Sequence, residues 1–241
     1  MEKIKYMTKN IIELEITLNC NFNCPCCNRL CDKKKNNTSS DMNISDVQNI
    51  LYNINKYSDK IDYITIIGGE PTVHPNFLNI CKYIKSNTNI NIEVSTNGSN
   101  DNIYKKEVEK LGIKYYTYNN DNTIDKKIRS HVNMYLSPYE EKCQIKSDCG
   151  LNCGISICKI NNKIYYAYCA NQKMIAIMLN RYDLLYTSLD NIMNDDMYNN
   201  ELTNNVCKHC QFMNIKRVKY KDNKNISECF KEGLCKYENR D

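Results

Sequence analysis

The chain has 241 residues, enough for one sizeable domain or for one domain with a small addition. Its net charge is +5, and its lysine run at 33–35 lies in a polar stretch typical of a solvated loop, not of a nucleic-acid-binding motif. No apolar run approaches the ~20 residues of a membrane-spanning helix, and residues 1–10 lack the apolar core of a signal peptide. We therefore expect a cytoplasmic protein with neither a nucleic-acid nor a membrane partner.

The 15 cysteines are the unusual feature of the composition. In an exported chain they would indicate disulfides, but an unexported chain lies among reducing thiols, where dense cysteine is more often bound to metal. Nine of the 15 lie between Cys143 and Cys235. Metal ligation is therefore the favoured use of these residues.

The first half of the chain predicts strands that alternate with helices. Residues 11–18 alternate between apolar and polar after their first pair, which predicts a strand that leads into Cys20. Ser45 and Gln48 have the spacing of a helix capping box, and Gly112 is placed to close a later helix. The other strands are expected at 63–67, 90–95, 113–118 and, in addition, near 132–136, and the helices at about 47–57, 77–86 and 104–111. This order predicts βαβ units and an α/β fold with a parallel sheet.

The alternation stops near residue 143. Residues 155–158 and 163–168 flank Asn161 and Asn162 and predict a β-hairpin, because asparagine tolerates a positive φ. A small module with little apolar core often depends on a metal for its fold. We therefore expect an α/β core over residues 1–140 and a small cysteine-rich metal-binding module over residues 141–241.

Three groups of chemically informative residues follow the first three predicted strands, namely the Cys20 loop, 68–71 and 95–98. The carboxyl ends of parallel strands are where such sheets gather their chemistry. Cys20, Cys24 and Cys27 have C-x3-C-x2-C spacing, so their thiolates can reach three irons of a [4Fe–4S] cluster and leave the fourth iron without a protein ligand. The alternative is a zinc site with Cys26 or Cys31 as the fourth ligand.

This loop, placed directly after the first strand, resembles that of the radical SAM superfamily. The resemblance implies a partial, open TIM-type β/α barrel and a [4Fe–4S] cluster whose open iron binds S-adenosyl-L-methionine (SAM). It also implies that one electron cleaves SAM to methionine and a 5′-deoxyadenosyl radical, which abstracts hydrogen from a substrate. The cofactor supplies the difficult chemistry, and the protein positions and shields it.

Two further segments match the superfamily. Gly68, Gly69, Glu70 and Pro71 match its GGEP motif, whose backbone and acidic side chain take up the methionine amino group. Ser95, Thr96 and Asn97 match a TNG-like stretch that reaches the ribose or carboxylate of SAM. Either segment alone would indicate only a turn. Cys26 departs from the family, which usually has an aromatic residue at this position that packs near the adenine of SAM. The residue that contacts the adenine is therefore not assigned.

The later cysteines resemble the SPASM and twitch modules that follow the barrel in many radical SAM enzymes. This resemblance implies an auxiliary [4Fe–4S] cluster, for which the preferred ligands are Cys153, Cys169, Cys207 and Cys210. Cys149 is the rival of Cys153, and a structural four-thiolate zinc site is the alternative.

The expected function is a radical SAM reaction, carried out without oxygen, that oxidises or otherwise modifies a small molecule or a ribosomally made peptide. A flavodoxin- or ferredoxin-type protein would donate the electron. The alternatives are a non-catalytic iron–sulfur or zinc-binding protein, or an activase of another enzyme. No general base can be nominated. The tyrosines at 115, 116 and 118 can face a cavity or pack in the core, and Cys81 is expected in the core.

Overall fold

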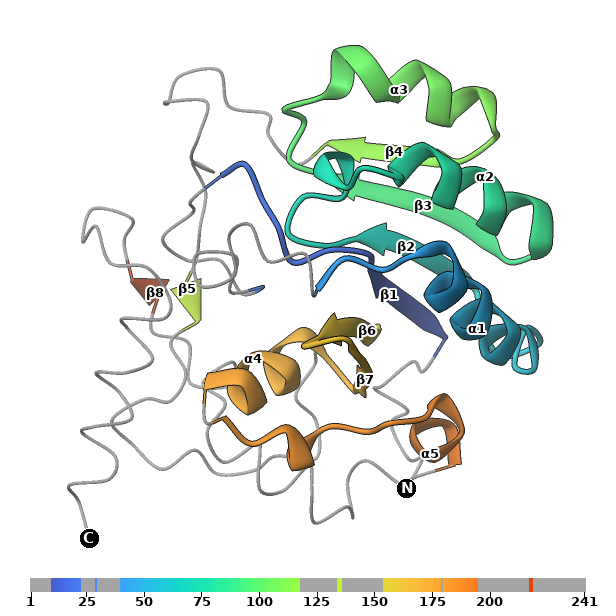
Figure 1. The fold of residues 1–241 in the computed structure, drawn as a ribbon. Coiled ribbons are helices and arrows are strands. Elements are labelled where there is room, and N and C mark those ends of the chain that lie inside the picture. The colour runs from blue at the N-terminus through green and yellow to red at the C-terminus, as the bar shows by residue number, and fades with distance from the viewer. Residues whose placement is uncertain are drawn as a thin grey trace, which may run out of the picture.

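The computed structural model describes residues 10–22, 29, 40–117, 154–178 and 180–194, together with the backbone of 134–135 and 217–218. Its centre is a six-stranded sheet with the strand order β4-β3-β2-β1-β6-β7 (Figure 1). The strands of this sheet are β1 (Ile11–Glu15), β2 (Tyr63–Ile67), β3 (Asn91–Thr96), β4 (Lys114–Thr117), β6 (Ile155–Ile160) and β7 (Lys163–Ala167).

Five helices and two short 3₁₀ turns are present in the described residues. They are α1 (Ile44–Asn55), α2 (Phe77–Asn87), α3 (Asp101–Lys110), α4 (Ala170–Met178) and α5 (Leu189–Asn194), with the turns η3 (Pro71–Val73) and η4 (Tyr182–Leu184). None of the helices in this part of the chain is long and apolar enough to cross a membrane.

The strand β1 lies in the middle of the sheet and pairs in parallel with both β2 and β6. From β1 to β4 every strand is parallel to the next, because a helix returns the chain to the same edge each time. The last strand, β7, pairs antiparallel with β6. The result is a mixed α/β sheet that does not close, as the sequence predicts for an open barrel.

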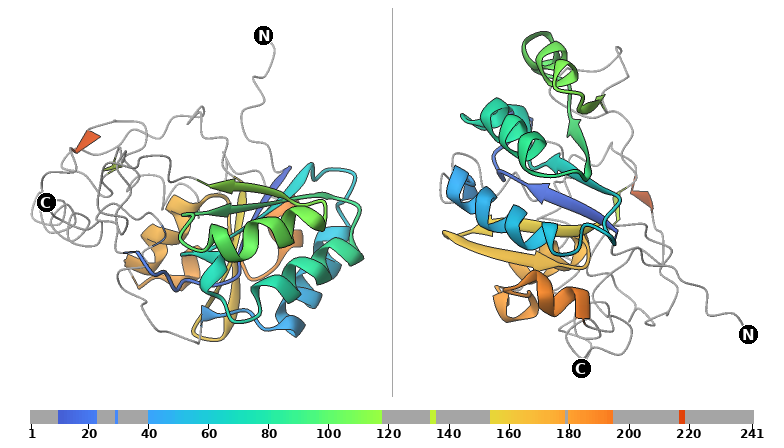
Figure 2. Two further views of the ribbon diagram at one scale, coloured as in Figure 1. Left: turned by 90° about the horizontal axis from the view of Figure 1, so that it is seen from above. Right: turned by 90° about the vertical axis from the view of Figure 1, so that its right-hand side faces the viewer.

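The two faces of β1 differ in chemistry. Ile12, Leu14 and Ile16 are buried in the main apolar core with residues of α1 and α2. Glu13 and Glu15 alternate with them and therefore point to the opposite face. Figures 1 and 2 show α1, α2 and α3 together on the first of these faces. The helices thus cover an apolar face, and the other face of β1 is acidic.

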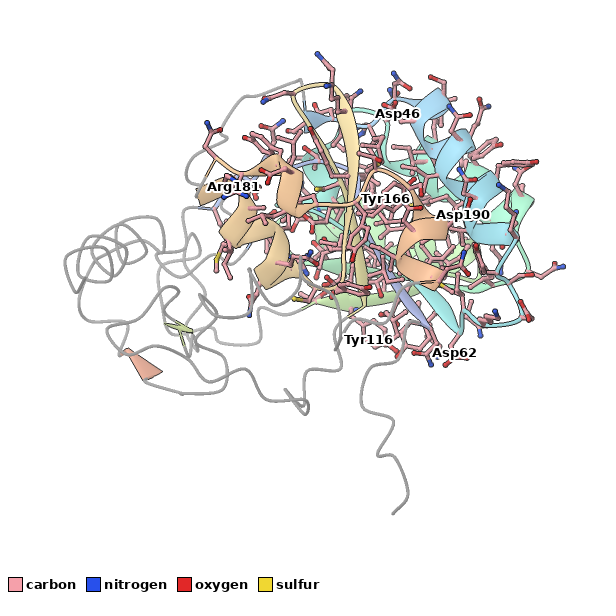
Figure 3. All side chains as sticks on the ribbon, turned by 90° about the horizontal axis from the view of Figure 1, so that it is seen from below. Asp46, Asp62, Tyr116, Tyr166, Arg181 and Asp190 are labelled. Atoms are coloured by element: carbon pink, nitrogen blue, oxygen red, sulfur yellow. The ribbon has the colours of Figure 1, made fainter. Side chains whose placement is uncertain are left out.

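The helices α4 and α5 lie on opposite faces of the sheet. On the α1 side, Tyr57, which follows α1, donates a hydrogen bond of 2.7 Å to Asp190 of α5. Figure 3 labels Asp190. In contrast, α4 supplies Lys173 to the acidic face of β1, where its ammonium contacts Glu15. Both helices follow β7 in the chain, so the segment after the hairpin reaches both sides of the sheet.

The cap of α1 differs from the predicted one. Asn43 is the capping residue. Its Oδ1 accepts a hydrogen bond from the Asp46 backbone N at 2.8 Å, and Asp46 Oδ2 accepts one from the Asn43 backbone N at 2.9 Å. Ser45 lies inside the helix and donates to Asn43 Oδ1. The predicted pair of Ser45 and Gln48 was therefore wrong by two residues, because Asn43 and Asp46 satisfy the same rule with a shorter acidic side chain.

The fifth predicted strand does not extend the parallel sheet. Only two of its residues form a strand, β5 (Met134–Tyr135), which pairs antiparallel with β8 (Arg217–Val218) in a separate two-stranded sheet. The edge of β1 opposite β2, where a further parallel strand could pair, is occupied by β6.

The predicted hairpin is confirmed. Asn161 and Asn162 connect β6 to β7 with φ values of 50° and 62°, the left-handed conformation that a two-residue turn of this kind requires. The hairpin is not apart from the core, because β6 is hydrogen-bonded along β1. The division at residue 140 stays a prediction, and β6 and β7 are structurally continuous with the first sheet.

Candidate functional site

The chain that leads to Cys20 runs beside the segment after β2. Ile16 N donates to Ile67 O at 3.0 Å, Gly69 N donates to Thr17 O at 2.9 Å, and Glu70 N donates to Asn19 O at 2.9 Å. These three bonds continue the parallel pairing of β1 and β2 beyond the strands themselves. Cys20 is thereby held next to the Gly-Gly-Glu-Pro segment, as the sequence predicts from the strand ends.

Gly68 is required by this close approach. A Cβ atom at position 68 would lie 2.4 Å from the carbonyl oxygen of Thr17, which belongs to the backbone and cannot rotate away. A side chain here would push the segment before Cys20 off the end of β2. The first glycine of the motif therefore sets the spacing between these two chains.

The carboxylate of Glu70 joins the second and third motifs. It is fully buried, and its Oε1 accepts hydrogen bonds from Thr72 N at 3.0 Å, Thr72 Oγ1 at 2.5 Å and Thr96 Oγ1 at 2.6 Å. Its Oε2 accepts from the backbone N of Asn97 at 2.7 Å. Both oxygens are thus engaged by protein donors, so the side chain fixes the end of β3 against the turn that follows β2.

Asn97 connects this network to the cysteine loop. Its Nδ2 donates to Asn21 Oδ1 at 3.0 Å and lies 3.9 Å from Cys20 Sγ, and its Oδ1 accepts from Ser99 N at 2.9 Å. Cys20 Sγ also accepts from the backbone N of Phe22 at 3.3 Å. N–H donors directed at a cysteine sulfur suit a thiolate that ligates iron. The surroundings of Cys20 therefore fit a cluster ligand.

Asp41 supports the segment before Cys20 in a way that the sequence did not predict. Asp41 Oδ1 accepts from Thr17 Oγ1 at 2.5 Å and from Asn19 Nδ2 at 3.0 Å. His74 lies nearby in a buried position, and burial lowers the pKa of its imidazole. The polar residues at 17 and 19 were visible in the sequence, but their partner Asp41 lies 24 and 22 residues further along the chain, a separation that no local pattern reveals.

The predicted site residues divide between described and undescribed parts of the chain. Around Cys20 the structure brings together the predicted SAM-binding residues of the two turns, namely Gly68, Gly69, Glu70, Pro71, Thr96 and Asn97. The seventh predicted residue, Ser95, is buried near the end of β3. Five of the predicted metal ligands lie outside the described residues, namely Cys24, Cys27, Cys153, Cys207 and Cys210. Within the described residues no three His, Cys, Asp or Glu side chains form a metal site.

Cys169 is the described member of the predicted auxiliary set. It directly precedes α4, and its Sγ accepts from the backbone N of Gln172 at 3.4 Å. The free N–H groups and the dipole at the start of a helix favour a thiolate at this position. Gln172 is itself fixed, since its side chain accepts from Tyr168 N at 2.6 Å and donates to Leu184 O at 3.0 Å.

A buried cluster of charges lies on the acidic face of β1, close in sequence to the cysteine loop. Arg29 donates to Glu13 at 2.8 Å and to Glu15 at 2.7 Å, and Lys173 contacts Glu15 in a fully buried ion pair. Ser156 Oγ adds a hydrogen bond of 2.5 Å to Glu15. Burial raises the pKa of the Glu15 carboxyl, but the charges of Lys173 and Arg29 outweigh burial and lower it to about 2. Glu15 is therefore ionised in the folded chain.

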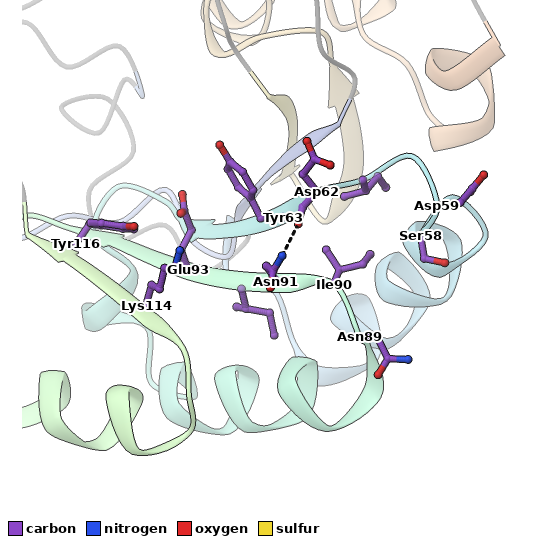
Figure 4. Close-up of a pocket in the computed structure, with 12 residues that line it drawn as sticks. Ser58, Asp59, Asp62, Tyr63, Asn89, Ile90, Asn91, Glu93, Lys114 and Tyr116 are labelled. Atoms are coloured by element: carbon purple, nitrogen blue, oxygen red, sulfur yellow. Dashed lines mark hydrogen bonds between the residues drawn. The ribbon is translucent and has the colours of Figure 1, made fainter.

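A hollow lies at the other end of the sheet, where the strands begin. Figure 4 shows it between Asp62, Tyr63, Asn91, Lys114 and Tyr116. Asp62, Tyr63, Asn91 and Lys114 precede or begin β2, β3 and β4, whereas Tyr116 lies further along β4, in register with Ser95 of β3. Most of the hollow thus lies at the end of the sheet opposite the motifs around Cys20.

The tyrosines near the end of β4 have different surroundings. Tyr115 is buried in the apolar core, where burial raises its pKa. Tyr116 lines the hollow in Figure 4 and is 44% exposed. Tyr118 lies outside the described residues. Core packing, one of the two roles expected for these residues, thus applies to Tyr115, and Cys81 is buried in the core as predicted.

We expect Glu70→Gln to lower the free energy of unfolding of the apoprotein by about 2–3 kcal/mol, measured by urea denaturation. The amide NH₂ of glutamine would face the backbone N–H of either Thr72 or Asn97, so one buried donor would lose its acceptor. Glu93→Gln is the matched control, because the Glu93 carboxylate is only partly buried and accepts from Thr65 Oγ1. Equal losses in the two variants would contradict the assigned role of Glu70.

The lowered pKa of Glu15 predicts a loss of stability in acid. The unfolded carboxyl takes up a proton below about 4.5, whereas the folded one stays ionised until about 2, so its contribution is complete above pH 4.5 and is lost as the pH falls toward 2. The full difference is about 3 kcal/mol. Urea denaturation between pH 5 and 3 should show a flatter dependence for Glu15→Gln than for the wild type. The exposed-pair variant Glu107→Gln should follow the wild type; an unchanged slope in Glu15→Gln would refute the pKa assignment.

Comparisons with known proteins agree with this geometry. The model of the radical SAM superfamily matches residues 14–135, half of the chain, and the match includes all three motifs described above. A curated relative, the 7,8-dihydro-6-hydroxymethylpterin dimethyltransferase of Methanocaldococcus jannaschii, is 26% identical over 109 residues, or 44% of this chain and 21% of the relative. The match thus spans about a fifth of that protein's length.

A solved structure of BtrN in complex with AdoMet and 2-DOIA is also similar, with a TM-score of 0.49 and 14% sequence identity. The similarity covers 87% of this chain and 94% of that one. The superfamily match over half of the chain, together with the arrangement of Cys20, Gly68 to Glu70 and Asn97, decides the family. The chain belongs to the radical SAM superfamily.

Proposed function

We propose that the chain is a radical SAM enzyme that cleaves S-adenosyl-L-methionine reductively and uses the resulting radical to take hydrogen from an organic substrate. The observation that carries this proposal is the single hydrogen-bonded network that joins Cys20, Glu70 and Asn97 at neighbouring strand ends. A non-catalytic metal protein would explain the cysteines, but it would not explain why the turns at 68–71 and 95–98 are hydrogen-bonded to the cysteine loop and to the residues just before it.

Cys20, Cys24 and Cys27 are the proposed ligands of the [4Fe–4S] cluster. When bound there, the cluster supplies the electron that cleaves SAM to methionine and a 5′-deoxyadenosyl radical. The chain contributes by holding Cys20 at a fixed distance from the turn after β2. The bonds from Gly69 N and Glu70 N to the backbone before Cys20 provide this restraint.

The SAM-binding surface is proposed to consist of Gly68, Gly69, Glu70 and Pro71 after β2 and of Ser95, Thr96 and Asn97 at the end of β3. Because both carboxylate oxygens of Glu70 already accept protein hydrogen bonds, its side chain acts mainly by shaping the backbone of the two turns. Backbone carbonyl groups of a glycine turn are suitable acceptors for the methionine ammonium. The side chain of Asn97 lies between Cys20 and Asn21 and so is next to the proposed cluster.

The auxiliary [4Fe–4S] cluster is proposed to be bound by Cys153, Cys169, Cys207 and Cys210, in a twitch- or SPASM-like module. Two features support it. The hairpin of β6 and β7 starts two residues after Cys153 and ends two residues before Cys169, so the two cysteines flank it. Cys169 also lies at the amino end of α4, where a thiolate is favoured.

The substrate is proposed to be a small molecule or a ribosomally made peptide, and the electron donor a flavodoxin- or ferredoxin-type protein. If the reaction is an oxidation, the substrate radical must give up one electron. The auxiliary cluster is the proposed acceptor of that electron, which would keep the reaction free of molecular oxygen.

Replacement of Cys20 by alanine should abolish dithionite-dependent release of 5′-deoxyadenosine from SAM and lower the iron content of the anaerobically reconstituted chain. Cys81→Ala is the matched control, because Cys81 is buried in the apolar core of α2 and should leave both measurements unchanged. Metal analysis that finds zinc in the wild type, together with no cleavage of SAM, would refute the proposed function.

The double replacement of Cys207 and Cys210 by alanine should separate the two clusters. We expect the iron content to fall from about eight to about four atoms per chain, while slow cleavage of SAM persists and product formation is lost. Iron analysis and chromatographic detection of 5′-deoxyadenosine measure these effects. Normal product yield in the variant would exclude the auxiliary cluster as electron acceptor.

A further inference from the structure

Glu15 is the common partner of two cations that come from the two cysteine-bearing parts of the chain. Arg29 follows Cys27 by two residues, and Lys173 follows Cys169 by four residues. Both side chains contact the carboxylate of Glu15, which is fully buried at the end of β1. Neither the SAM-binding motifs nor the predicted ligand set assigns a role to these three residues.

Arg29 holds its place through two carboxylates. One terminal nitrogen donates to Glu15 and the other to Glu13, at 2.7 and 2.8 Å, and the Arg29 side chain is 11% exposed. Because the guanidinium is planar and rigid, two such contacts fix its direction as well as its position. The chain at position 29 is thereby attached to the acidic face of β1, nine residues after Cys20.

Lys173 attaches α4 to the same carboxylate. Its side chain is fully buried, and the neighbouring residues of α4, Met174 and Ile175, are buried too. A buried ammonium without a counter-charge is strongly unfavourable, so α4 can pack here only if Glu15 is ionised and in place. Two carboxylates and two cations make the cluster neutral as a whole, and Ser156 of β6 completes the contacts of Glu15.

We propose that Glu15 is a positioning residue that anchors residues 20–29, the SAM-cluster loop, through Arg29 and couples this loop to α4 through Lys173. The inference rests on the proposed function in one respect, the binding of a cluster by this loop. Loss of Glu15 should loosen the loop even when the fold persists. The same loss should let the position of Cys20 vary more relative to α4, the helix that follows Cys169.

The decisive variant is Glu15→Leu combined with Lys173→Met. Replacing a buried ion pair by apolar residues of similar volume often preserves stability, so this chain is expected to fold with a melting temperature close to that of the wild type. Arg29 would keep only Glu13 as a partner. A purely structural role of Glu15 would be fully replaced in this variant, whereas a positioning role would not. Glu15→Gln, which leaves Lys173 without its counter-charge, serves as the destabilised comparison.

The first measurement is alkylation of the metal-free, reduced full-length chain by iodoacetamide, followed by trypsin and mass spectrometry. The cysteines of the SAM-cluster loop fall in the tryptic peptide 10–29, and Cys81 falls in the peptide 61–82. Cys81 is an internal reference for global unfolding, because it is buried and burial raises the pKa of its thiol to about 12. We expect peptide 10–29 to react about fivefold faster in the double variant than in the wild type, with an unchanged rate at Cys81.

The second measurement is the anaerobic release of iron from the reconstituted chain to a chelator, with Glu93→Gln as the control on β3, which is separated from β1 by β2. Release should be about fivefold faster in the double variant and unchanged in the control. Wild-type rates for peptide 10–29 in the double variant, or equal acceleration at Cys81, would overturn the proposal. A wild-type chain that binds no iron would instead refute the proposed function, and the alkylation rates would still decide the role of Glu15.

Discussion

The parallel pairing of β1 with β2 is the constraint on which the candidate site depends. It continues past both strands through the bonds of Gly69 N and Glu70 N, and it is possible only because position 68 has no side chain. This pairing sets Cys20 beside the second motif. The carboxylate of Glu70 then extends the arrangement to β3 by accepting from Thr96 and from the backbone of Asn97. One backbone pairing and one buried carboxylate thus bring three distant segments together.

The central strand also separates two tasks. Its isoleucine and leucine side chains pack with α1 and α2 and stabilise the sheet. On the other face, Glu13 and Glu15 form ion pairs with the side chains of Arg29 and Lys173, which lie outside the sheet. The apolar face follows the general tendency of sheets covered by helices. The acidic face is unusual, because a buried ion pair adds little net stability. The contacts of Glu13 and Glu15 fix the direction of the Arg29 side chain, which is what a loop that is proposed to hold a cluster beside a strand end would require.

Local patterns were sufficient to predict the strands β1 to β4, the helices α1 to α3 and the Asn161–Asn162 hairpin, because each is determined by neighbouring residues. The helices α4 and α5, which follow the hairpin, were not predicted. The junction of the three motifs was also predictable, since parallel strands end at one edge. The partners that act across long separations were not. Asp41 supports Thr17 and Asn19, and Lys173 meets Glu15 across 158 residues. The position of β6 beside β1 was missed for the same reason, because a short apolar strand carries no mark of its neighbour.

Cys20, Cys24 and Cys27 are proposed to leave one iron of the cluster open for SAM. Mössbauer spectroscopy of the ⁵⁷Fe-reconstituted chain with Cys207 and Cys210 replaced by alanine tests this proposal most directly, because this variant is expected to retain only that cluster. SAM should change the signal of one iron site in four and leave the other three nearly unchanged. Four iron sites that do not respond to SAM, or a chain that contains no iron–sulfur cluster, would contradict the proposal.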